Sequence, residues 1–236
     1  MWYKNLAIIL PTFNESKNLR ILLEKINKVV PAAHVIIVDD SNDKENGRIK
    51  KIAGIYKNVE VITRQKKMGR GSAVLDGFIY ALKNKHYEYF VEMDTDLAHD
   101  PLELPLLYKA LTARNAHLII GSRYLDKSKI VDWPLRRLVL SKLINFFLNF
   151  WLGLKLHDYT NGFRIYERQA VEYLTKVGLK EKGFIALSES AYLLKKRGFK
   201  IIEVPITFTD RKHGESTVGT KELLMCFIGA VKIRLR

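Results

Sequence analysis

Residues 6–40 read LAIILPTFNESKNLRILLEKINKVVPAAHVIIVDD and contain one strand–helix–strand unit. The runs at 6–10 and 35–38 are apolar and mostly leucine or β-branched, and they have the length of buried strands. Between them, from residue 19 to residue 30, apolar side chains recur every three or four positions on one helical face, and Asn14 or Ser16 is available as the N-cap. The unit predicts two parallel strands joined by a crossover helix.

The same alternation continues through the first half of the chain. Short apolar runs lie at 59–63, 89–93 and 118–120, and each ends in polar or glycine-rich residues. Repeated strand–helix–strand units predict an α/β fold whose Rossmann-like, mostly parallel sheet is covered by helices on both faces. Because such sheets bind ligands at the carboxyl ends of their strands, the loops after the strands are the candidate ligand loops.

The second half of the chain has a different pattern. Its expected elements are an amphipathic helix at 138–154, a polar loop at 160–162, a helix at 188–196, a strand at 201–208 and a basic C-terminal segment. Polar residues interrupt the run at 138–154 at helical spacing, so this helix is amphipathic rather than a span of about 20 apolar residues. Because no Gly- or Ser-rich linker separates the halves, we expect a single domain over residues 1–236, with 1–122 and 123–236 as its two functional halves.

The composition restricts the class of protein and its partners. The 236 residues carry 40 Lys and Arg against 25 Asp and Glu, a formal net charge of +15, and 47% of them are hydrophobic. This composition excludes disorder, collagen and coiled coil, and its basic excess favours an anionic partner: nucleic acid, nucleotide or an anionic lipid surface. The single cysteine, Cys226, cannot form an internal disulfide, so a reducing compartment fits best. The apolar run at 6–10 is too short for a signal peptide.

Carboxylates follow three of the expected strands. Asp94 and Asp96 lie at alternate positions after the run at 89–93, two adjacent acids lie at 39–40, and Glu15 follows the first run. Hard oxygen ligands that are few in number suit Mg²⁺ or Mn²⁺ shared with substrate phosphates. Taken alone, the 94–96 triplet is better interpreted as a solvated loop or a helix N-cap. Acids from three loops at one sheet edge, in a protein of charge +15, favour a metal or a hydroxyl-rich ligand.

The segment RQKKMGRG at 64–71 precedes an expected helix at 72–84. Basic side chains, then glycines, then a helix N-terminus are typical of a phosphate or pyrophosphate cradle. The spacing of Gly69, Gly71 and Gly77 fits neither a Walker loop nor the dinucleotide fingerprint. A basic surface turn is an equally good interpretation of this segment by itself.

Ordered motifs extend over nearly the whole chain. They are PTFNE at 11–15, VDD at 38–40, GRGSA at 69–73, MDTDL at 93–97, GSRY at 121–124, WP at 133–134 with Arg137 and Ser141, TNGFR at 160–164, EVPI at 203–206, Arg211, and GES at 214–216. In this order they resemble the motifs of the dolichyl-phosphate (polyprenyl-phosphate) mannose synthases of glycosyltransferase family 2, which have the GT-A fold. The GSRY, WP and GFR elements are the ones more specific to polyprenyl-phosphate acceptors.

The resemblance implies an inverting glycosyltransferase that moves mannose from GDP-mannose to a polyprenyl or dolichyl phosphate, with Mg²⁺ or Mn²⁺ as cofactor. Residues 1–122 would be the nucleotide-sugar half, and 123–236 the acceptor and membrane-surface half. The implied metal ligands are Asp94 and Asp96, the implied catalytic residues are Asp96, Arg123 and Arg137, and Arg123, Arg137 and Ser141 would bind the acceptor phosphate. The residues implied for nucleotide-sugar binding are Pro11, Phe13, Glu15, Val38, Asp40, Asp94, Thr95, Asp96, Arg123, Arg211, His213 and Lys221.

The sequence leaves the donor open. The alternative to GDP-mannose is glucose or another hexose from a UDP-sugar, transferred to the same lipid, because no residue pattern here separates guanine from uracil. Nucleic acid is not expected as a partner, since basic residues interleaved with exposed aromatics in a recognisable pattern are missing from the sequence. A catalytically silent relative would need a lost acid at Asp94 or Asp96, and both are present.

An acceptor that stays in a bilayer requires the site to reach a membrane surface. The helix expected at 138–154 carries Phe146, Phe147, Phe150 and Trp151 between basic flanks, which is typical of an interfacial helix, although an ordinary buried helix is the strongest alternative. A second apolar stretch at 223–231 precedes the basic C-terminal residues Lys232, Arg234 and Arg236. We expect peripheral attachment at the cytoplasmic face of the membrane. A separate membrane-anchoring subunit is compatible with this expectation.

Overall fold

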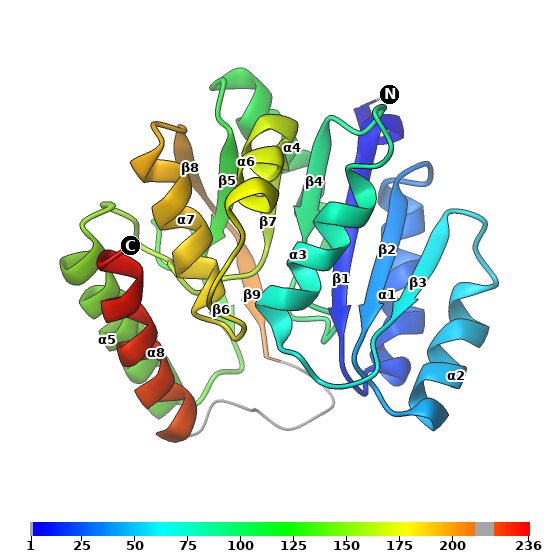
Figure 1. Cartoon of the computed structure of the whole chain (residues 1–236), viewed down its shortest axis with the longest axis horizontal. Coiled ribbons are helices and arrows are strands. Elements are labelled where there is room, and N and C mark those ends of the chain that lie inside the picture. Colours follow the sequence, from blue (N-terminus) through cyan, green and yellow to red (C-terminus); the bar gives the residue numbers. More distant parts are fainter. Residues whose placement is uncertain (1, 211–219) are drawn as a thin grey trace.

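A seven-stranded sheet lies at the centre of the molecule, in the order β3-β2-β1-β4-β7-β5-β8 (Figure 1). The computed structural model describes residues 2–210 and 220–236, and the side chains of 220–225 are outside the description. Each strand pairs in parallel with its neighbours except β7, which is antiparallel to both β4 and β5. The strands are β1 (Leu6–Thr12), β2 (His34–Asp39), β3 (Val59–Thr63), β4 (Tyr89–Glu92), β5 (Leu118–Ser122), β7 (Arg164–Glu167) and β8 (Ile201–Pro205).

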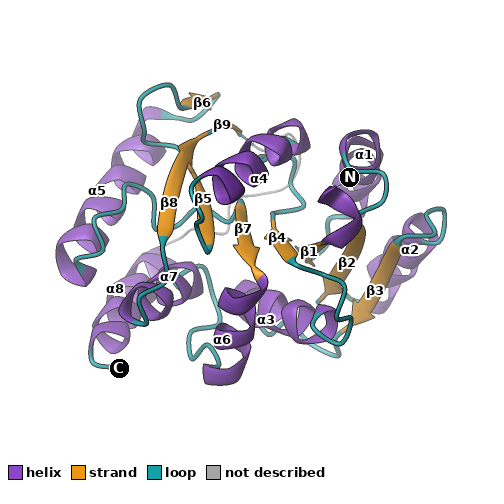
Figure 2. Ribbon diagram, turned by 90° about the horizontal axis from the view of Figure 1, so that it is seen from above, coloured by secondary structure: helices purple, strands orange, loops and turns teal. Residues whose placement is uncertain are grey.

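Helices cover both faces of the sheet (Figure 2), which confirms the predicted α/β architecture. One hydrophobic core joins the sheet to α1, α2 and α4, and a second joins it to α3, α6, α7 and parts of α5 and α8. The helices are α1 (Ser16–Val29), α2 (Asp43–Ala53), α3 (Arg70–Ala81), α4 (Leu104–Ala113), α5 (Leu135–Leu152), α6 (Arg168–Val177), α7 (Ala186–Lys196) and α8 (Thr220–Arg234), with short 3₁₀ turns η1 (Trp2–Asn5) and η2 (Pro101–Glu103).

The run at 6–10 is apolar at every position because β1 is buried on both sides. Ala7 and Ile9 face the core of α3, whereas Leu6, Ile8 and Leu10 face the core of α1 and α4. Successive side chains of a strand point to opposite faces, so a strand covered by helices on both faces needs no polar residues. The predicted runs at 35–38, 59–63, 89–93 and 118–120 are likewise confirmed as strands.

Strand β7 is the main departure from the predicted sheet. It lies between β4 and β5, although β5 follows β4 in the sequence with only α4 as the long helix between them. This strand has only the sequence RIYE, from Arg164 to Glu167, and it begins and ends with a charged residue. It therefore lacks the apolar run that is typical of a buried strand. The Arg164 side chain is nevertheless fully buried, because backbone carbonyls of Tyr159, Asn161 and Leu187 accept its hydrogen bonds.

The single strand expected at 201–208 is divided into two. Strand β8 ends at Pro205, and β9 (Thr207–Thr209) leaves the main sheet to pair in parallel with β6 (Lys129–Val131). Pro205 has no N–H for a sheet hydrogen bond, which favours a strand end at this position. The small β6–β9 sheet holds the segments before α5 and after β8 together.

Three helix boundaries differ from the prediction. Neither Asn14 nor Ser16 is the N-cap of α1: this position is Glu15, since Asn14 has φ of 59° and Ser16 donates to Glu45. Helix α3 begins at Arg70 rather than at residue 72 and ends at Ala81. Helix α5 begins at Leu135, after Pro134, and ends at Leu152 because Gly153 adopts the left-handed conformation, with φ of 69°.

Helices α5 and α8 lie side by side beyond β8 (Figures 1 and 2). The rings of Phe147 and Phe227 are 4.6 Å apart, and the Trp151 indole donates to the carbonyl of Ala230 at 3.0 Å. Cys226 is partly buried and packs against the adjoining core. Among the described helices, none has the length and hydrophobicity that a membrane span requires.

Candidate active site

The polar loops after β1, β2, β4 and β5 meet at the edge of the sheet formed by the carboxyl ends of these parallel strands (Figure 1). The Thr95 hydroxyl donates to the carbonyl of Pro11 at 3.0 Å and ties the loop after β4 to β1. The backbone N–H of Asn14 donates to Ser41 Oγ at 2.7 Å and ties the loop after β1 to that after β2. The sheet therefore brings several of the predicted nucleotide-sugar residues to one place.

Phe13 presents an aromatic ring at this edge. Its side chain is 40% exposed, and the ammonium of Lys67 lies 4.1 Å from the ring centroid. Val38 is fully buried at the end of β2, and Glu15 accepts from the Asn18 amide at 2.6 Å. An exposed ring beside a cation suits stacking against a flat heterocycle.

The segment at 64–71 is an anchored loop rather than a free basic turn. Arg64 is buried and binds both carboxylate oxygens of Asp40, at 2.5 and 2.6 Å, and its other donors reach Ser72, Asp76 and the carbonyl of Gly69. Gly69 has φ of +96°, and a Cβ there would lie 2.4 Å from the carbonyl oxygen of Lys182. Only glycine fits this position.

Arg70, the first residue of α3, contacts the acid triplet. Its Nε donates to Asp94 Oδ1 at 2.7 Å, its Nη1 to Glu92 at 3.1 Å, and its Nη2 to the carbonyl of Gly162 at 3.3 Å. Burial by itself lowers the pKa of Arg70, but the negative charges of Asp94 and Glu92 raise it well above its ordinary value. The Arg70 guanidinium is therefore a permanent cation beside Asp94.

His99 fixes the acid loop, the segment 93–98 that follows β4. Its Nδ1 accepts from the backbone N–H of Asp94 at 3.2 Å, so Nε2 carries the proton and donates to Asn161 Oδ1 at 2.8 Å. The ring stacks on Phe163, with 5.2 Å between centroids. Asp96 is partly exposed, and its Oδ1 accepts from the N–H of Ala98 at 3.1 Å.

Arg123, which follows β5, is buried and tightly held. Its Nε and Nη2 bind the two carboxylate oxygens of Asp158 at 2.7 Å each, and Nη2 also donates to Thr160. Burial alone lowers the pKa of Arg123, but Asp158 raises it, and the charge of Asp94 adds to this rise. The loop of Asp94 lies near Arg123, because His99, which binds the backbone N–H of Asp94, and Arg123 both contact the ring of Phe208.

Trp133 lies within cation–π distance of both predicted acceptor arginines. Its ring is 5.3 Å from the Arg123 guanidinium carbon and 4.1 Å from that of Arg137. Arg137 also pairs with Asp210 at 2.5 Å, and its side chain is 27% exposed. The indole N–H of Trp133 is buried and has no hydrogen-bond acceptor among the described residues. Two guanidiniums and one unsatisfied donor gather here, and an anion would suit such a group.

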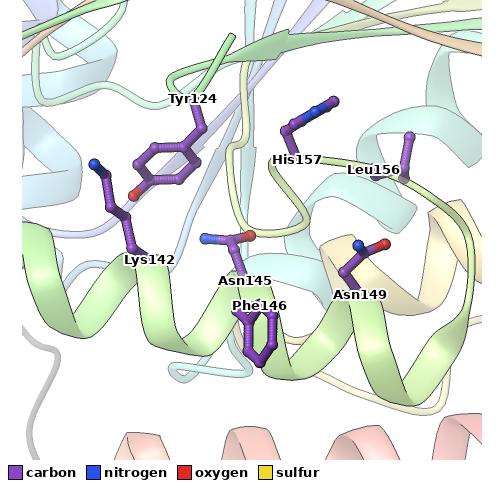
Figure 3. Close-up of a pocket in the computed structure, with 7 residues that line it drawn as sticks. All are labelled: Tyr124, Lys142, Asn145, Phe146, Asn149, Leu156 and His157. Carbon is purple, nitrogen blue, oxygen red and sulfur yellow. The ribbon is translucent and has the colours of Figure 1, made fainter.

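A pocket of about 220 Å³ lies along one side of α5, next to this cluster (Figure 3). Ser141 is the third predicted acceptor residue. Its hydroxyl oxygen accepts a hydrogen bond of 2.6 Å from the hydroxyl of Tyr124, which lines this pocket. Asn145 and Asn149 point from α5 toward the loop of Leu156 and His157, whereas Phe146 points away. The lining residues are Tyr124, Lys142, Asn145, Phe146, Asn149, Leu156 and His157.

Helix α5 buries one polar side chain, Asn145, beside the apolar Leu148 and Leu152. Asn145 is buried and bonds to Ser141, Tyr159 and Thr160. Several large apolar side chains of the same helix are exposed, which excludes an ordinary buried helix. The exposed ones on α5 are Leu135, Val139, Leu140, Leu143, Phe146 and Phe150, and those on α8 are Phe227, Ile228 and Val231.

Some predicted residues fall elsewhere. Arg211 and His213, and the side chain of Lys221, lie outside the described residues. Of the basic C-terminal residues, Arg236 is tied to buried Glu189 and Arg234 contacts Trp151, so they do not form a free tail. The sequence reasoning missed Arg70, Glu92, His99, Asp158 and Asn161 as parts of the site. Two of them had a signal in the sequence: Arg70 stands between two glycines, and Asn161 lies in the TNGFR motif. Glu92, His99 and Asp158 had none.

The donor set fits a hard divalent cation shared with a substrate. No cluster of three or more His, Cys, Asp or Glu side chains suited to a metal occurs among residues 2–210 and the described part of α8. Asp94 and Asp96 nevertheless supply two partly exposed carboxylates at a strand end. Mg²⁺ is commonly held by one or two carboxylates together with substrate phosphates and water, so these residues fit such an ion.

Two relatives are similar to this chain over most of its length. The chain is 37% identical to the polyprenol monophosphomannose synthase of Mycolicibacterium smegmatis, over 90% of this chain and 80% of that protein. It is 35% identical to the undecaprenyl-phosphate mannosyltransferase of Micrococcus luteus, over 89% of this chain and 86% of that protein.

Solved structures share the fold. Glucosyl-3-phosphoglycerate synthase from Mycobacterium tuberculosis, crystallised with Mn²⁺, uridine diphosphate and glucosyl-3-phosphoglycerate, superposes with a TM-score of 0.68 at 17% identity, covering 98% of this chain and 78% of that one. The same enzyme with Mg²⁺ and uridine diphosphate gives 0.67 at 19% identity, with the same coverage. This likeness supports the GT-A expectation and shows the fold alone. Residues 7–175 match the family described as glycosyl transferase family 2, and the chain belongs to that family.

Proposed function

We propose that this protein transfers mannose from GDP-mannose to a polyprenyl phosphate of the dolichyl or undecaprenyl type, with inversion at the anomeric carbon. The observation that carries the proposal is the cluster of Arg123, Trp133 and Arg137 near the Asp94 loop, because it would offer an anion site next to a metal and diphosphate site. The names of the two relatives support mannose as the sugar and a polyprenyl phosphate as the acceptor.

The nucleotide would lie over the loops after β1, β2 and β4. Phe13 offers its exposed ring to the base, and Asp94 and Asp96 would hold Mg²⁺ or Mn²⁺. A bound divalent ion there would neutralise the charge that develops on the departing diphosphate. Residues 1–122 thus form the nucleotide-sugar half in this proposal. Arg211, His213 and Lys221 remain proposed donor contacts.

The acceptor phosphate would be held by Arg123, Arg137 and Ser141. A phosphate monoester carries a second pKa near 6, so at neutral pH its oxygen is already an anion and needs no strong general base. That oxygen forms a bond to the anomeric carbon while the bond from this carbon to the diphosphate breaks, and GDP leaves on the opposite side. The arginines position the nucleophile and offset its repulsion from the donor.

The exposed apolar faces of α5 and α8 support peripheral attachment to a membrane. Phe146 and Phe150 are 73% and 77% exposed, and Arg136 and Lys142 lie on the same helix. An amphipathic helix with this arrangement lies in the plane of a bilayer surface, and its basic residues favour an anionic leaflet. Residues 123–236 would then form the acceptor and membrane half. We place this at the cytoplasmic face, with an anchoring subunit as a further proposed partner.

A donor panel with a lipid acceptor tests the proposal. The purified chain is incubated with a polyprenyl phosphate in detergent, Mg²⁺ or Mn²⁺, and labelled GDP-mannose, UDP-glucose or UDP-N-acetylglucosamine, and the lipid product is separated by chromatography. We expect mannosyl lipid from GDP-mannose alone. This donor should also raise the melting temperature of the protein, by an amount that grows with the ratio of its concentration to Kd. Transfer only from a UDP-sugar would replace the donor assignment. No transfer to lipid from any donor by the folded chain would refute the proposal.

A further inference from the structure

The guanidinium of Arg70 occupies one side of the predicted metal ligand Asp94. Its Nε donates to Asp94 Oδ1 at 2.7 Å, a normal length for a charge-assisted hydrogen bond. The Arg70 side chain is 10% exposed and that of Asp94 is 24% exposed. The contact is therefore shielded from water, and a divalent ion that binds Asp94 meets a fixed positive charge.

Several contacts prevent Arg70 from leaving this position easily. Buried Glu92 binds its Nη1 at 3.1 Å, and the carbonyl of Gly162 accepts from its Nη2. A Cβ on Gly162 would lie only 2.0 Å from Arg70 Nη2, so the guanidinium packs directly against this backbone. Arg70 is held between the acid loop and the loop before β7.

We infer that Arg70 is a resident counter-ion of Asp94 which makes divalent metal binding depend on the nucleotide diphosphate. Free metal binds weakly, because it and the guanidinium compete for the same carboxylate. A diphosphate brings negative charge to the site and offsets the repulsion, so metal and nucleotide bind with positive coupling. This inference rests on the proposed nucleotide and metal site, and it makes Arg70 a positioning residue rather than a catalytic one.

The expected size follows from the effect of a neighbouring charge on a carboxylate. A cation next to a carboxylate commonly weakens its binding of a proton by about ten- to a thousandfold, and the sign is the same for any other cation. Replacing Arg70 by a neutral residue should therefore tighten Mn²⁺ binding by about tenfold or more in the absence of nucleotide.

Mn²⁺ titration followed by electron paramagnetic resonance measures free metal directly and needs no turnover. The variants are Arg70→Gln, which removes the charge, and Arg70→Lys, which keeps it. Arg168→Gln is the matched control, because Arg168 on α6 also bonds to backbone carbonyls and to an acid, Glu172, away from the site. Each titration is repeated with saturating GDP and with UDP.

We expect Mn²⁺ to bind more tightly to Arg70→Gln than to the original chain. Arg70→Lys and Arg168→Gln should bind Mn²⁺ about as the original chain does. Adding Asp94→Asn to Arg70→Gln should abolish the tighter binding. The ratio of the Mn²⁺ dissociation constants without and with GDP should fall in Arg70→Gln. If Arg70→Gln does not fold, the double variant Arg70→Gln with Glu92→Gln replaces it, because Glu92 is the buried acid that loses its partner. The double variant should bind Mn²⁺ more tightly to the same extent.

Unchanged or weaker Mn²⁺ binding in a folded charge-removing variant would overturn the inference. So would an equal gain in Arg168→Gln, or a gain that survives Asp94→Asn, since neither would involve the contact between Arg70 and Asp94. Failure of GDP and UDP to bind, or absence of mannose transfer, would instead contradict the proposed function. The Mn²⁺ titrations without nucleotide would still report on Arg70 in that case.

Discussion

Arg123 and Asp158 form a buried bidentate ion pair in which both carboxylate oxygens accept from the guanidinium at 2.7 Å. The two residues are 35 positions apart in the sequence, and the backbone N–H of Arg123 donates to the same carboxylate at 3.0 Å. Asp158 therefore fixes an arginine whose proposed role is to hold the acceptor phosphate. Removing either partner leaves an uncompensated charge in the interior.

Asp158→Asn should lower the free energy of unfolding by about 3–5 kcal/mol, the usual cost of breaking a buried pair. Burial alone raises the pKa of Asp158, but the charge and hydrogen bonds of Arg123 lower it below its ordinary value of 3.8. Because the folded pKa is the lower one, the pair's contribution is full above about pH 4 and is lost as the pH falls through the folded pKa.

Urea denaturation at several pH values checks this prediction. Stability of the original chain should fall more steeply below about pH 4 than that of Asp158→Asn, because the variant has no carboxyl to protonate at this position. Equal acid sensitivity of the two proteins would mean that Asp158 is not the titrating group.

Asp96→Asn should reduce turnover by about a hundredfold or more while changing stability little. Asp96 is partly exposed, and an amide oxygen can still accept from the N–H of Ala98. Steady-state rates with Mn²⁺ and thermal unfolding give the two measurements. Full activity of the original chain in excess EDTA would contradict a metal role for Asp94 and Asp96.

Arg137→Ala should raise the KM for polyprenyl phosphate or lower turnover, and leave GDP affinity intact. Its pair with Asp210 is partly exposed, so we expect a stability loss below about 1 kcal/mol. Arg136→Ala is the matched control, because Arg136 is the exposed neighbour on α5. Calorimetry that shows an equal loss of GDP affinity would assign Arg137 to the donor site instead.

Phe146→Ser with Phe150→Ser should lower vesicle binding by about tenfold or more at high salt, where the attraction between basic residues and anionic lipid is screened. Phe147→Ser is the matched control, because it makes the same substitution on the same helix. Because Phe147 packs on Phe227 of α8, this change should cost stability, about 2 kcal/mol, rather than vesicle binding.

Flotation with vesicles containing anionic lipid, at low and high salt, measures both effects. We expect binding of the original chain that high salt reduces but does not abolish. Absence of binding at low salt, or equal binding by the Phe146 and Phe150 double variant, would refute the membrane role of this face.

Much of the sheet was predictable because its signals are local. The runs at 6–10 and 35–38 are apolar throughout, since parallel strands buried on both faces tolerate little else. The acids at Asp94 and Asp96 were placed correctly after a strand for the same reason, as a loop position follows from where the strand ends. Strand β7 was missed because RIYE has no local pattern, and only its two neighbours, distant in the sequence, make it a strand.

The sequence by itself predicted an amphipathic helix at 138–154, close to the observed helix at Leu135–Leu152, because the spacing of apolar and polar residues is intrinsic to the segment. It did not determine which side faces inward. Only the tertiary structure placed Asn145 in the interior and Phe146 outside, because the polar groups of Tyr159 and Thr160 come from another loop and need a partner when buried. The pairing of Arg70 with Asp94 was decided in the same way, since a strand end and a helix start become neighbours only when the chain folds.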